Sequence, residues 1–360
     1  MTILTYRYRI KDSTAGKHLL RMSSAVNKVW NFCNEVTLLA WRRDKRLLTQ
    51  YDLQKLTAGV AQDLGLASET IQEICREYAQ KRQQFHRIKL KWRSRKRSLP
   101  WIPLRGDGFR IVGDTVIYRR KRYRLWLSRP VAGTIKTGSF TQDARGHWYV
   151  NLACDVPALH GPPGPQEVGI DLGLTDQIAC THLPEPLSRA NITKHYALKL
   201  AMAQRANKAK RVKALHAKIA NTRKDWTHKA TTAIASQARL IAVGNVSSTK
   251  LAKTPFAKST YDAGWGITRA LLRYKAERLG AHYVEVSEFR SSCTCAVCGS
   301  LTGPRGLRQL GVKVWTCSVC GTRHHRDINS AHIHLRLGRQ TLFQESQRLE
   351  RWEDVNRAGW

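Results

Sequence analysis

The chain has 360 residues, enough to bury a large core and to form two or three domains. Its 62 lysine and arginine residues against 26 aspartate and glutamate residues leave a formal net charge of +36. Because such a field attracts polyanions and no apolar stretch approaches membrane-spanning length, we expect nucleic acid as the partner and no membrane.

The first half of the chain alternates between strand and helix patterns. Residues 1–10, MTILTYRYRI, alternate apolar and polar side chains as a strand does. They lack the charged and apolar segments of a secretion signal, so we expect a cytoplasmic protein. From Thr14 to about Ile88, apolar residues recur at three- and four-residue steps, which predicts helices. Residues 109–157 alternate again, and with the first strand they could form one small barrel that the helices interrupt.

Two segments carry dense positive charge. Residues 87–97, RIKLKWRSRKR, contain seven basic residues, with Trp92 and Trp101 interleaved. A charge run is usually a solvated face, but cations mixed with aromatic rings suit phosphate contact and base stacking, which the global charge favours here. Residues 194–229, within a helix predicted over 194–238, contain eleven lysine and arginine residues. A solvated helix and a phosphate-binding face explain this segment equally well.

After a proline- and glycine-rich linker at 160–167, strands and helices alternate. The predicted order is the strand EVGIDLGL, the helix over 194–238, the strand RLIAVGNV, a helix over 259–280, the strand HYVEVSE and a last helix from Asp327. This alternation predicts an α/β domain with a mixed or parallel sheet. Asp171 lies inside the first of these strands, and a buried carboxylate must be paired, neutralised or bound to a metal. Asp176, the nearest candidate partner, lies at the end of the apolar run, and two acids alone would only repel each other.

Five of the nine cysteines lie close together near residue 300. Two CxxC pairs separated by eighteen residues predict a four-cysteine zinc ribbon, with the ligands Cys295, Cys298, Cys317 and Cys320. Four thiolates close the tetrahedral shell, so this zinc would be structural. Gly299 and Gly321 can take the left-handed conformation after each pair. Redox pairs or disulfides are the weaker alternative in a cytoplasmic chain, and we expect Cys293 to be a spectator.

Several motifs between about 166 and 340 together resemble those of the transposon-encoded TnpB RNA-guided nucleases, relatives of the compact type V CRISPR effectors. They are GIDLGL, LIAVGNVSSTKLAKT followed by DAGW and LLRYKAERLGAHYVEVSE, the paired CxxC motifs, and HHRDINSAH. The resemblance implies an α+β multidomain protein. An N-terminal β-barrel, the wedge, carries a helical recognition insertion, and a ribonuclease H-like (RuvC) α/β nuclease domain with an inserted zinc ribbon follows.

The resemblance also implies domain boundaries. Residues 1–12 and 96–160 would form the wedge, 13–95 the recognition domain, 161–290 and 323–345 the nuclease domain, 291–322 the zinc ribbon that binds the target nucleic acid, and 346–360 a C-terminal tail. Proteins of this family bind an RNA made from the transposon end, recognise a short motif beside the target, and cut double-stranded DNA with two Mg²⁺ ions. We therefore expect a guide RNA and target DNA as partners, a monomer with one RNA, and a place in the prokaryotic cytoplasm or nucleoid.

The family resemblance makes Asp171 and Asp327 the first and last catalytic acids, but it exposes one departure. Most relatives carry a glutamate at the end of the fourth strand, where this chain has Gly244 and Asn245. The next strand, HYVEVSE, would lie beside this one, and its terminal Glu288 could reach the same metals; a subgroup of the family resembles this rearrangement. Strand alternation puts Glu285 on the opposite face, so we favour Glu288.

Two rival functions remain open from the sequence. The first is an RNA-guided DNA-binding repressor of the same family whose nuclease is inactive, which Gly244 supports and the retained acids oppose. The second is a zinc-ribbon DNA-binding or transposase-like protein that uses no guide.

Overall fold

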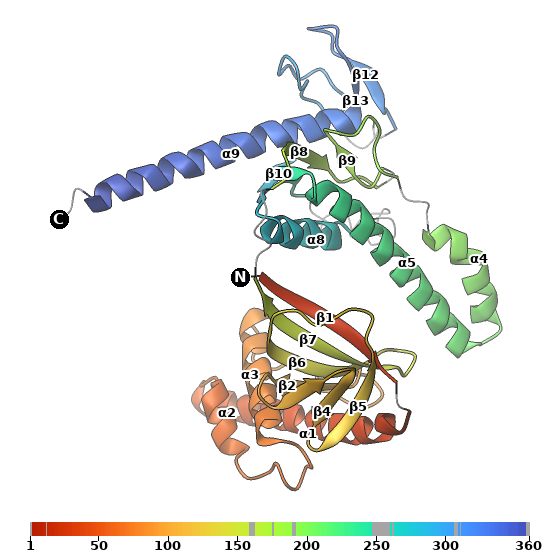
Figure 1. The fold of residues 1–360 in the computed structure, drawn as a ribbon, viewed down its shortest axis with the longest axis vertical. Helices are drawn as coiled ribbons and strands as arrows, with labels where there is room; N and C mark the ends of the chain where they lie inside the picture. Colours follow the sequence, from red (N-terminus) through yellow and green to blue (C-terminus); the bar gives the residue numbers. More distant parts are fainter. Residues whose placement is uncertain are drawn as a thin grey trace. The chain divides into compact units, whose positions relative to one another are not determined.

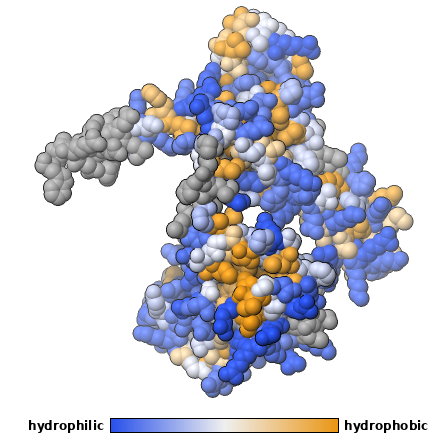
Figure 2. All heavy atoms as spheres, in the orientation of Figure 1, coloured by the Kyte–Doolittle hydropathy of each residue, from blue (hydrophilic) through white to orange (hydrophobic). Residues whose placement is uncertain are grey.

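The chain forms two compact units, Met1–Pro157 and Ala158–Trp360. The computed structural model, drawn in Figure 1, describes residues 2–11, 13–157, 163–174, 176–188, 192–246, 260, 263–305, 309 and 311–357. Figure 2 shows hydrophilic side chains over most of the face in view, as expected for a chain with this charge. In this part of the chain, no helix has the length and apolar character needed to cross a membrane.

The first unit is built on a seven-stranded antiparallel sheet with the order β2-β6-β7-β1-β5-β4-β3. Its strands are β1 (Thr2–Ile10), β2 (Trp101–Arg105), β3 (Phe109–Val112), β4 (Thr115–Tyr118), β5 (Lys121–Trp126), β6 (Thr134–Gln142) and β7 (Trp148–Val156). The N-terminal strand therefore pairs with strands that follow the helices, as the alternation pattern predicted. The sheet curls nearly into a barrel. The two edges approach one another, since the ring of Phe109 on the edge strand β3 packs against Gly138 of β6, the neighbour of the other edge strand.

Three helices separate β1 from β2 in sequence and share one hydrophobic core with the sheet. They are α1 (Ser13–Asp44), α2 (Gln50–Leu56) and α3 (Ser68–Gln84). Trp30 of α1 and Tyr78 of α3 are buried in the same cluster as Tyr8 and Phe140 of the sheet. Residues 85–100 form neither helix nor strand, so the helical part ends before residue 95.

The second unit contains a four-stranded mixed sheet with the order β11-β10-β8-β9. Its strands are β8 (Gln166–Asp171), β9 (Ala179–Cys180), β10 (Ala238–Gly244) and β11 (His282–Val286). The strands β8, β10 and β11 are parallel neighbours, whereas β9 is antiparallel to β8. The predicted mixed sheet is confirmed, and so is the expectation that HYVEVSE lies beside IAVGNV. The carboxyl ends of the three parallel strands therefore meet at one edge of the sheet.

Among the described residues of this unit, four helices accompany the sheet: α4 (Ile192–Arg205), α5 (Ala209–Ala235), α8 (Trp265–Arg278) and α9 (Arg326–Arg357). The single helix predicted over 194–238 is wrong. Asn207, with a φ of +50°, takes the left-handed conformation that interrupts a helix between α4 and α5. The helix predicted over 259–280 is α8, while residues 247–259, 261 and 262 lie outside the described ranges. The helix α9 continues to Arg357, so the segment predicted as a tail is helical up to that residue.

Small residues let α9 cross the sheet at close range. A Cβ atom on Gly169 of β8 would overlap the carbonyl oxygen of Ala331, and one on Gly338 would lie 2.5 Å from the Cβ of Ala242. The helix therefore rests directly on β8 and β10. Its first turn, which contains Asp327, follows a short antiparallel hairpin of β12 (Val314–Thr316) and β13 (Arg323–His325).

Candidate active site and metal centre

Three acidic residues meet at the carboxyl edge of the second sheet. Asp171 is the last residue of β8, Glu288 lies two residues beyond the end of β11, and Asp327 is the second residue of α9. Burial, and then the charges of Glu288 and Asp327, raise the pKa of Asp171 well above its usual value. The structure thus brings together three carboxylates that come from distant parts of the sequence and repel one another.

Gly244, at the end of β10, explains how Glu288 reaches this group. A Cβ atom on Gly244 would lie 2.7 Å from Oε1 and 2.8 Å from Cγ of Glu288. The Glu288 side chain therefore occupies the space that any side chain at position 244 would need. Burial raises the pKa of Glu288 to about 7, although Arg269 and the backbone of Val246 act in the opposite direction.

Glu285, the alternative acid, is engaged elsewhere. Its carboxylate pairs with Arg273 Nη2 at 2.6 Å and with Arg269 Nη1 at 3.5 Å, both from α8. The hydroxyl of Tyr283 also donates to it at 2.9 Å. Of the two candidate glutamates, only Glu288 is among the charges that raise the pKa of Asp171.

A lysine bridges two acids beside this group. Lys313 Nζ lies 2.5 Å from Asp327 Oδ2 and 2.8 Å from Asp176 Oδ2. Burial alone would lower the pKa of Lys313, but the hydrogen bonds to Asp176 and Asp327 raise it above its usual value. Asp176 also accepts a hydrogen bond from Ser188 at 2.8 Å, so it is bound to Lys313 and Ser188. No sequence motif pointed to Lys313, because a lone lysine carries no pattern.

His334 is a buried histidine next to Asp171. It lies seven residues after Asp327, hence on the same face of α9, and it is fully buried. Its Nδ1 lies 2.9 Å from the carbonyl oxygen of Ile170 and 3.9 Å from Asp171 Oδ1. Burial lowers the pKa of His334, so the ring is neutral and Nδ1 donates to this carbonyl. No sequence motif pointed to His334, although its spacing of seven residues from Asp327 could have indicated it.

The three acids offer the kind of ligand that a hard divalent cation prefers. Carboxylate oxygens are the ligands by which proteins commonly bind Mg²⁺. Bound cations would offset the repulsion among Asp171, Glu288 and Asp327 that helps to raise the pKa of Asp171.

The sulfur atoms of Cys295, Cys298, Cys317 and Cys320 gather into one compact group, all within 4.8 Å of one another. The Cys295–Cys320 and Cys298–Cys317 sulfur pairs are 3.7 and 3.6 Å apart. With metal–sulfur bonds of about 2.3 Å, a tetrahedral zinc site places its sulfur atoms about 3.8 Å apart. The four thiols therefore fit a closed, tetrahedral metal site.

The turns around these cysteines support the same geometry. Gly299 and Gly321 have φ values of +77° and +73°, which confirms the predicted left-handed conformation after each pair. Hydrogen bonds from Ser300 and then Thr302 lower the pKa of Cys317 to about 5, so this sulfur is a thiolate at neutral pH. His324 Nε2 lies 3.1 Å from the sulfur of Cys295. Cys293 lies outside the group, and its thiol contacts the carbonyl oxygen of Arg290.

Known proteins resemble this chain in sequence. Residues 265–333, which include Glu288, the four cysteines and Asp327, match the family described as Cas12f1-like, TNB domain. A putative RNA-guided DNA endonuclease of Streptomyces pristinaespiralis is 27% identical, covering 92% of this chain and 88% of that protein. The putative RNA-guided DNA endonuclease InsQ of Escherichia coli K12 is 26% identical, covering 61% of this chain and 60% of that protein.

A solved structure shares the fold. Cas12f1, determined in complex with an sgRNA and target DNA, superposes with a TM-score of 0.59 at 13% identity, covering 90% of this chain and 83% of that one. In sequence the chain is similar to these two putative RNA-guided DNA endonucleases, within residues 265–333 it matches the Cas12f1-like TNB domain, and in fold it is similar to Cas12f1.

Proposed function

We propose that the chain is an RNA-guided endonuclease that hydrolyses DNA at the site formed by Asp171, Glu288 and Asp327. The observation that carries this proposal is the convergence of these carboxylates at one sheet edge, where burial and mutual repulsion raise the pKa of Asp171. Such a group is unfavourable unless cations offset its charge. The substrate class follows from the named activity of the relatives and from the net charge of +36.

The reaction we propose is two-metal phosphodiester hydrolysis. Asp171, Glu288 and Asp327 would hold two Mg²⁺ ions, which when bound would supply an activated water and stabilise the leaving 3′ oxygen. Asp171 ends β8 and Glu288 lies two residues beyond the end of β11, so the sheet would fix the ions and the scissile phosphate relative to one another. Lys313 adds a positive charge beside Asp327, at 2.5 Å, where it can also attract the DNA phosphate.

Guide RNA and target DNA are the partners in this proposal. The RNA would come from the transposon end and select the target by base pairing, next to a short motif in double-stranded DNA. We further propose that the first unit supplies the wedge and recognition domains, that the second supplies the nuclease domain, and that one chain binds one RNA.

We also propose that Cys295, Cys298, Cys317 and Cys320 hold one structural zinc ion. Their sulfur separations of 3.6 and 3.7 Å support a tetrahedral site. All four positions of the shell are filled by the protein, so no position remains for a substrate.

The nuclease-inactive alternative loses its main support. That alternative rested on Gly244, because a glycine at the end of β10 supplies no carboxylate to bind a metal ion. The Glu288 side chain fills the space beside Gly244, so the glycine accommodates the acid of the neighbouring strand.

The decisive experiment is a cleavage assay with purified protein, expressed beside its native flanking sequence so that its RNA copurifies. The substrate is a plasmid that carries the matching target next to a randomised motif. We expect cleavage in Mg²⁺, none in EDTA, none after the RNA is removed, and none with Asp171→Asn. A protein that binds the target but never cuts it in Mg²⁺ or Mn²⁺ is a repressor, and one that cuts without RNA is an unguided nuclease.

A further inference from the structure

Residues 85–98, which we call the strap, cross α1 in the first unit without forming helix or strand. Seven of the residues between 87 and 97 are basic. A segment of this composition could be a mobile, solvated run. The contacts of its backbone show that it is instead built into the fold.

Asparagines on one face of α1 hold the strap in place. Asn34 accepts from the backbone N–H of Leu90 at 2.9 Å and donates to the carbonyl oxygen of Leu90 at 3.0 Å. Asn31 makes the same pair of bonds with Arg93, both at 2.8 Å. Asn27, one turn earlier, accepts from the guanidinium of Arg93 at 2.8 Å. These amide side chains bond the strap as a neighbouring strand would.

The centre of the strap is fixed further by aromatic contacts. The guanidinium of Arg93 lies 5.7 Å from the ring centre of Trp30 and 5.6 Å from that of Trp101. The indole N–H of Trp30 donates to the carbonyl oxygen of Lys91 at 3.3 Å. Trp101, one of the two rings considered for base stacking from the sequence, is therefore used in packing. Trp92 is the ring that remains available, with 47% of its surface exposed.

The anchored strap forms one wall of a cleft of about 1000 Å³ between α1 and the end of α3. Phe85 and Trp92 line it together with six cations: Lys81, Arg87, Lys89, Lys91, Arg93 and Arg97. No carboxylate belongs to this lining. Within the described ranges, four of these cations, Arg87, Lys89, Lys91 and Arg97, are exposed and form no ion pair. The cleft thus combines unneutralised positive charge with open aromatic faces.

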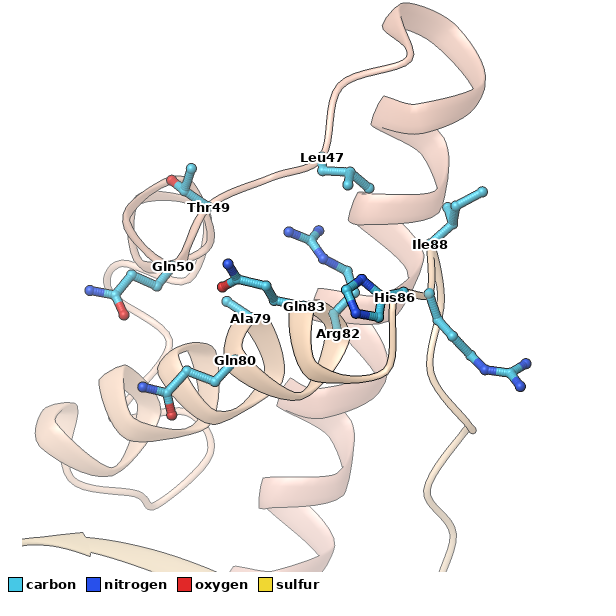
Figure 3. A pocket seen from close by; sticks show the side chains of 10 residues that line it. Leu47, Thr49, Gln50, Ala79, Gln80, Arg82, Gln83, His86 and Ile88 are labelled. Atoms are coloured by element: carbon cyan, nitrogen blue, oxygen red, sulfur yellow. The ribbon is translucent and has the colours of Figure 1, made fainter. Parts of the chain in front are cut away.

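A smaller hollow of about 580 Å³ continues past Arg87. Figure 3 shows the side chains of Arg82, Gln83 and His86 gathered around it. Arg82 is 8% exposed and donates to the carbonyl oxygen of Leu48 at 2.6 Å. The polar surface therefore extends beyond the cleft, along the strap and the last turn of α3.

We propose that the strap is a binding site for single-stranded nucleic acid, in which Trp92 stacks on an unpaired base and Lys89, Lys91 and Arg97 contact the flanking phosphates. Stacking on Trp92 requires a free base face, which a duplex does not offer away from its ends. Because the asparagines already hold the backbone, binding need not order the strap. The proposal rests on the proposed function only in taking nucleic acid as the ligand. The strand can come from the RNA or from unwound DNA.

Photocrosslinking of the full chain identifies the site and its source. The probes are a 12-nucleotide oligouridylate with one central 4-thiouridine and a 12-nucleotide oligothymidylate with one central 5-iododeoxyuridine. We expect mass spectrometry to locate crosslinks at Trp92 or its neighbours in the strap. A crosslink with only one probe assigns the site to that type of strand. The absence of strap crosslinks with both probes overturns the proposal.

Binding of the same oligonucleotides, measured by fluorescence anisotropy, tests the residue roles. Trp92→Ala should weaken binding about tenfold, whereas Tyr51→Ala, which removes an exposed ring outside both hollows, should not. Replacing Lys89 and Lys91 by glutamine should lower the slope of log affinity against log salt by about 1.4. The matched pair Arg95→Gln and Lys96→Gln removes the same charge from the strap outside the cleft lining and should change the slope by less. Equal effects of the two pairs, or an unchanged Trp92→Ala variant, would contradict the site.

The tests of the strap and the test of RNA-guided cleavage can fail independently of each other. If the wild type cleaves with its RNA while Trp92→Ala binds oligonucleotides normally, only the strap proposal fails. If the wild type neither copurifies with RNA nor cuts DNA, yet crosslinks through the strap, the proposed function fails and the binding site stands.

Discussion

The side chain of Glu288 lies in the space that a Cβ atom of Gly244 would occupy, with Oε1 2.7 Å from that position. Gly244 pairs in register with Val286 on the neighbouring parallel strand, and Glu288 follows two residues later. The acid of β11 can therefore fold over the end of β10 only because β10 ends in glycine. The two residues form one arrangement in which the missing side chain on one strand makes room for the carboxylate of the next.

The first prediction concerns the choice of acid. Glu288→Gln should reduce Mg²⁺-dependent cleavage by more than the roughly 10- to 100-fold typical of residues that only support a metal ligand. Guided DNA binding should persist, because it does not require catalysis. Glu285→Gln is the matched control and should cleave within a few-fold of the wild type. Single-turnover cleavage and gel-shift binding measure the two properties, and the reverse ranking would assign the role to Glu285.

The second prediction tests the steric relationship. Gly244→Ala should impair cleavage, since its Cβ would lie within 3 Å of both Glu288 and His334, and should leave RNA binding unchanged. The double variant Gly244→Glu with Glu288→Gly moves the acid back to β10 and should cleave faster than Glu288→Gly alone. Full activity of Gly244→Ala would show that the site tolerates displacement of Glu288.

The third prediction concerns pH. Burial raises the pKa of Glu288 to about 7 from 4.5, so in the folded, metal-free chain this group stays protonated where the unfolded chain is ionised. Stability should therefore fall as pH rises from about 4.5 through 7, the sign expected for a raised carboxyl pKa. Ions that bind the carboxylate reverse this loss. The rise in Tm caused by Mg²⁺ should be larger at pH 8 than at pH 5.5, and Glu288→Gln should reduce the difference. An equal rise at both pH values would argue against Glu288 as a ligand.

The fourth prediction concerns the cysteine group. Elemental analysis of the purified protein should find one zinc per chain. Cys317→Ser should lose zinc and lower the Tm of the second unit, because a tetrahedral site with three thiolates binds more weakly. Cys293→Ser, whose sulfur lies outside the group, should keep its zinc. A folded wild type without zinc would contradict the assignment.

The fifth prediction concerns the strap anchor. Asn34 is fully buried and bonds Leu90 through both backbone groups, while its Oδ1 also accepts from Tyr78 at 3.1 Å. Asn34→Leu leaves these groups unpaired and should lower the free energy of unfolding of the first unit by about 2–4 kcal/mol. Gln84→Leu, at an exposed position, should change it little. Urea unfolding measures the loss, and faster hydrogen exchange at Leu90 would locate it.

Local patterns determined a large part of this protein from the sequence alone. The CxxC spacing and the glycine after each pair predicted both the sulfur group and the left-handed turns, because every determinant lies within a few residues. The alternation of strand and helix patterns predicted the mixed sheet of the second unit. The alternation of apolar and polar side chains predicted that β1 belongs with strands that follow the helices. Asp327 lies in the first turn of the last helix, as expected, whereas the strand predicted to continue past Asp171 ends at that residue.

Only the tertiary structure decided which residues meet. The choice of Glu288 over Glu285 depends on the side chains of α8, whose arginines hold Glu285, and on the space above Gly244. Lys313 bridges two acids separated in sequence by about 150 residues, and His334 lies under Asp171 because α9 crosses β8 at Gly169. The strap is ordered by asparagines some 60 residues away. Such contacts depend on how distant segments pack against one another. The pattern of apolar residues within one segment therefore cannot predict them.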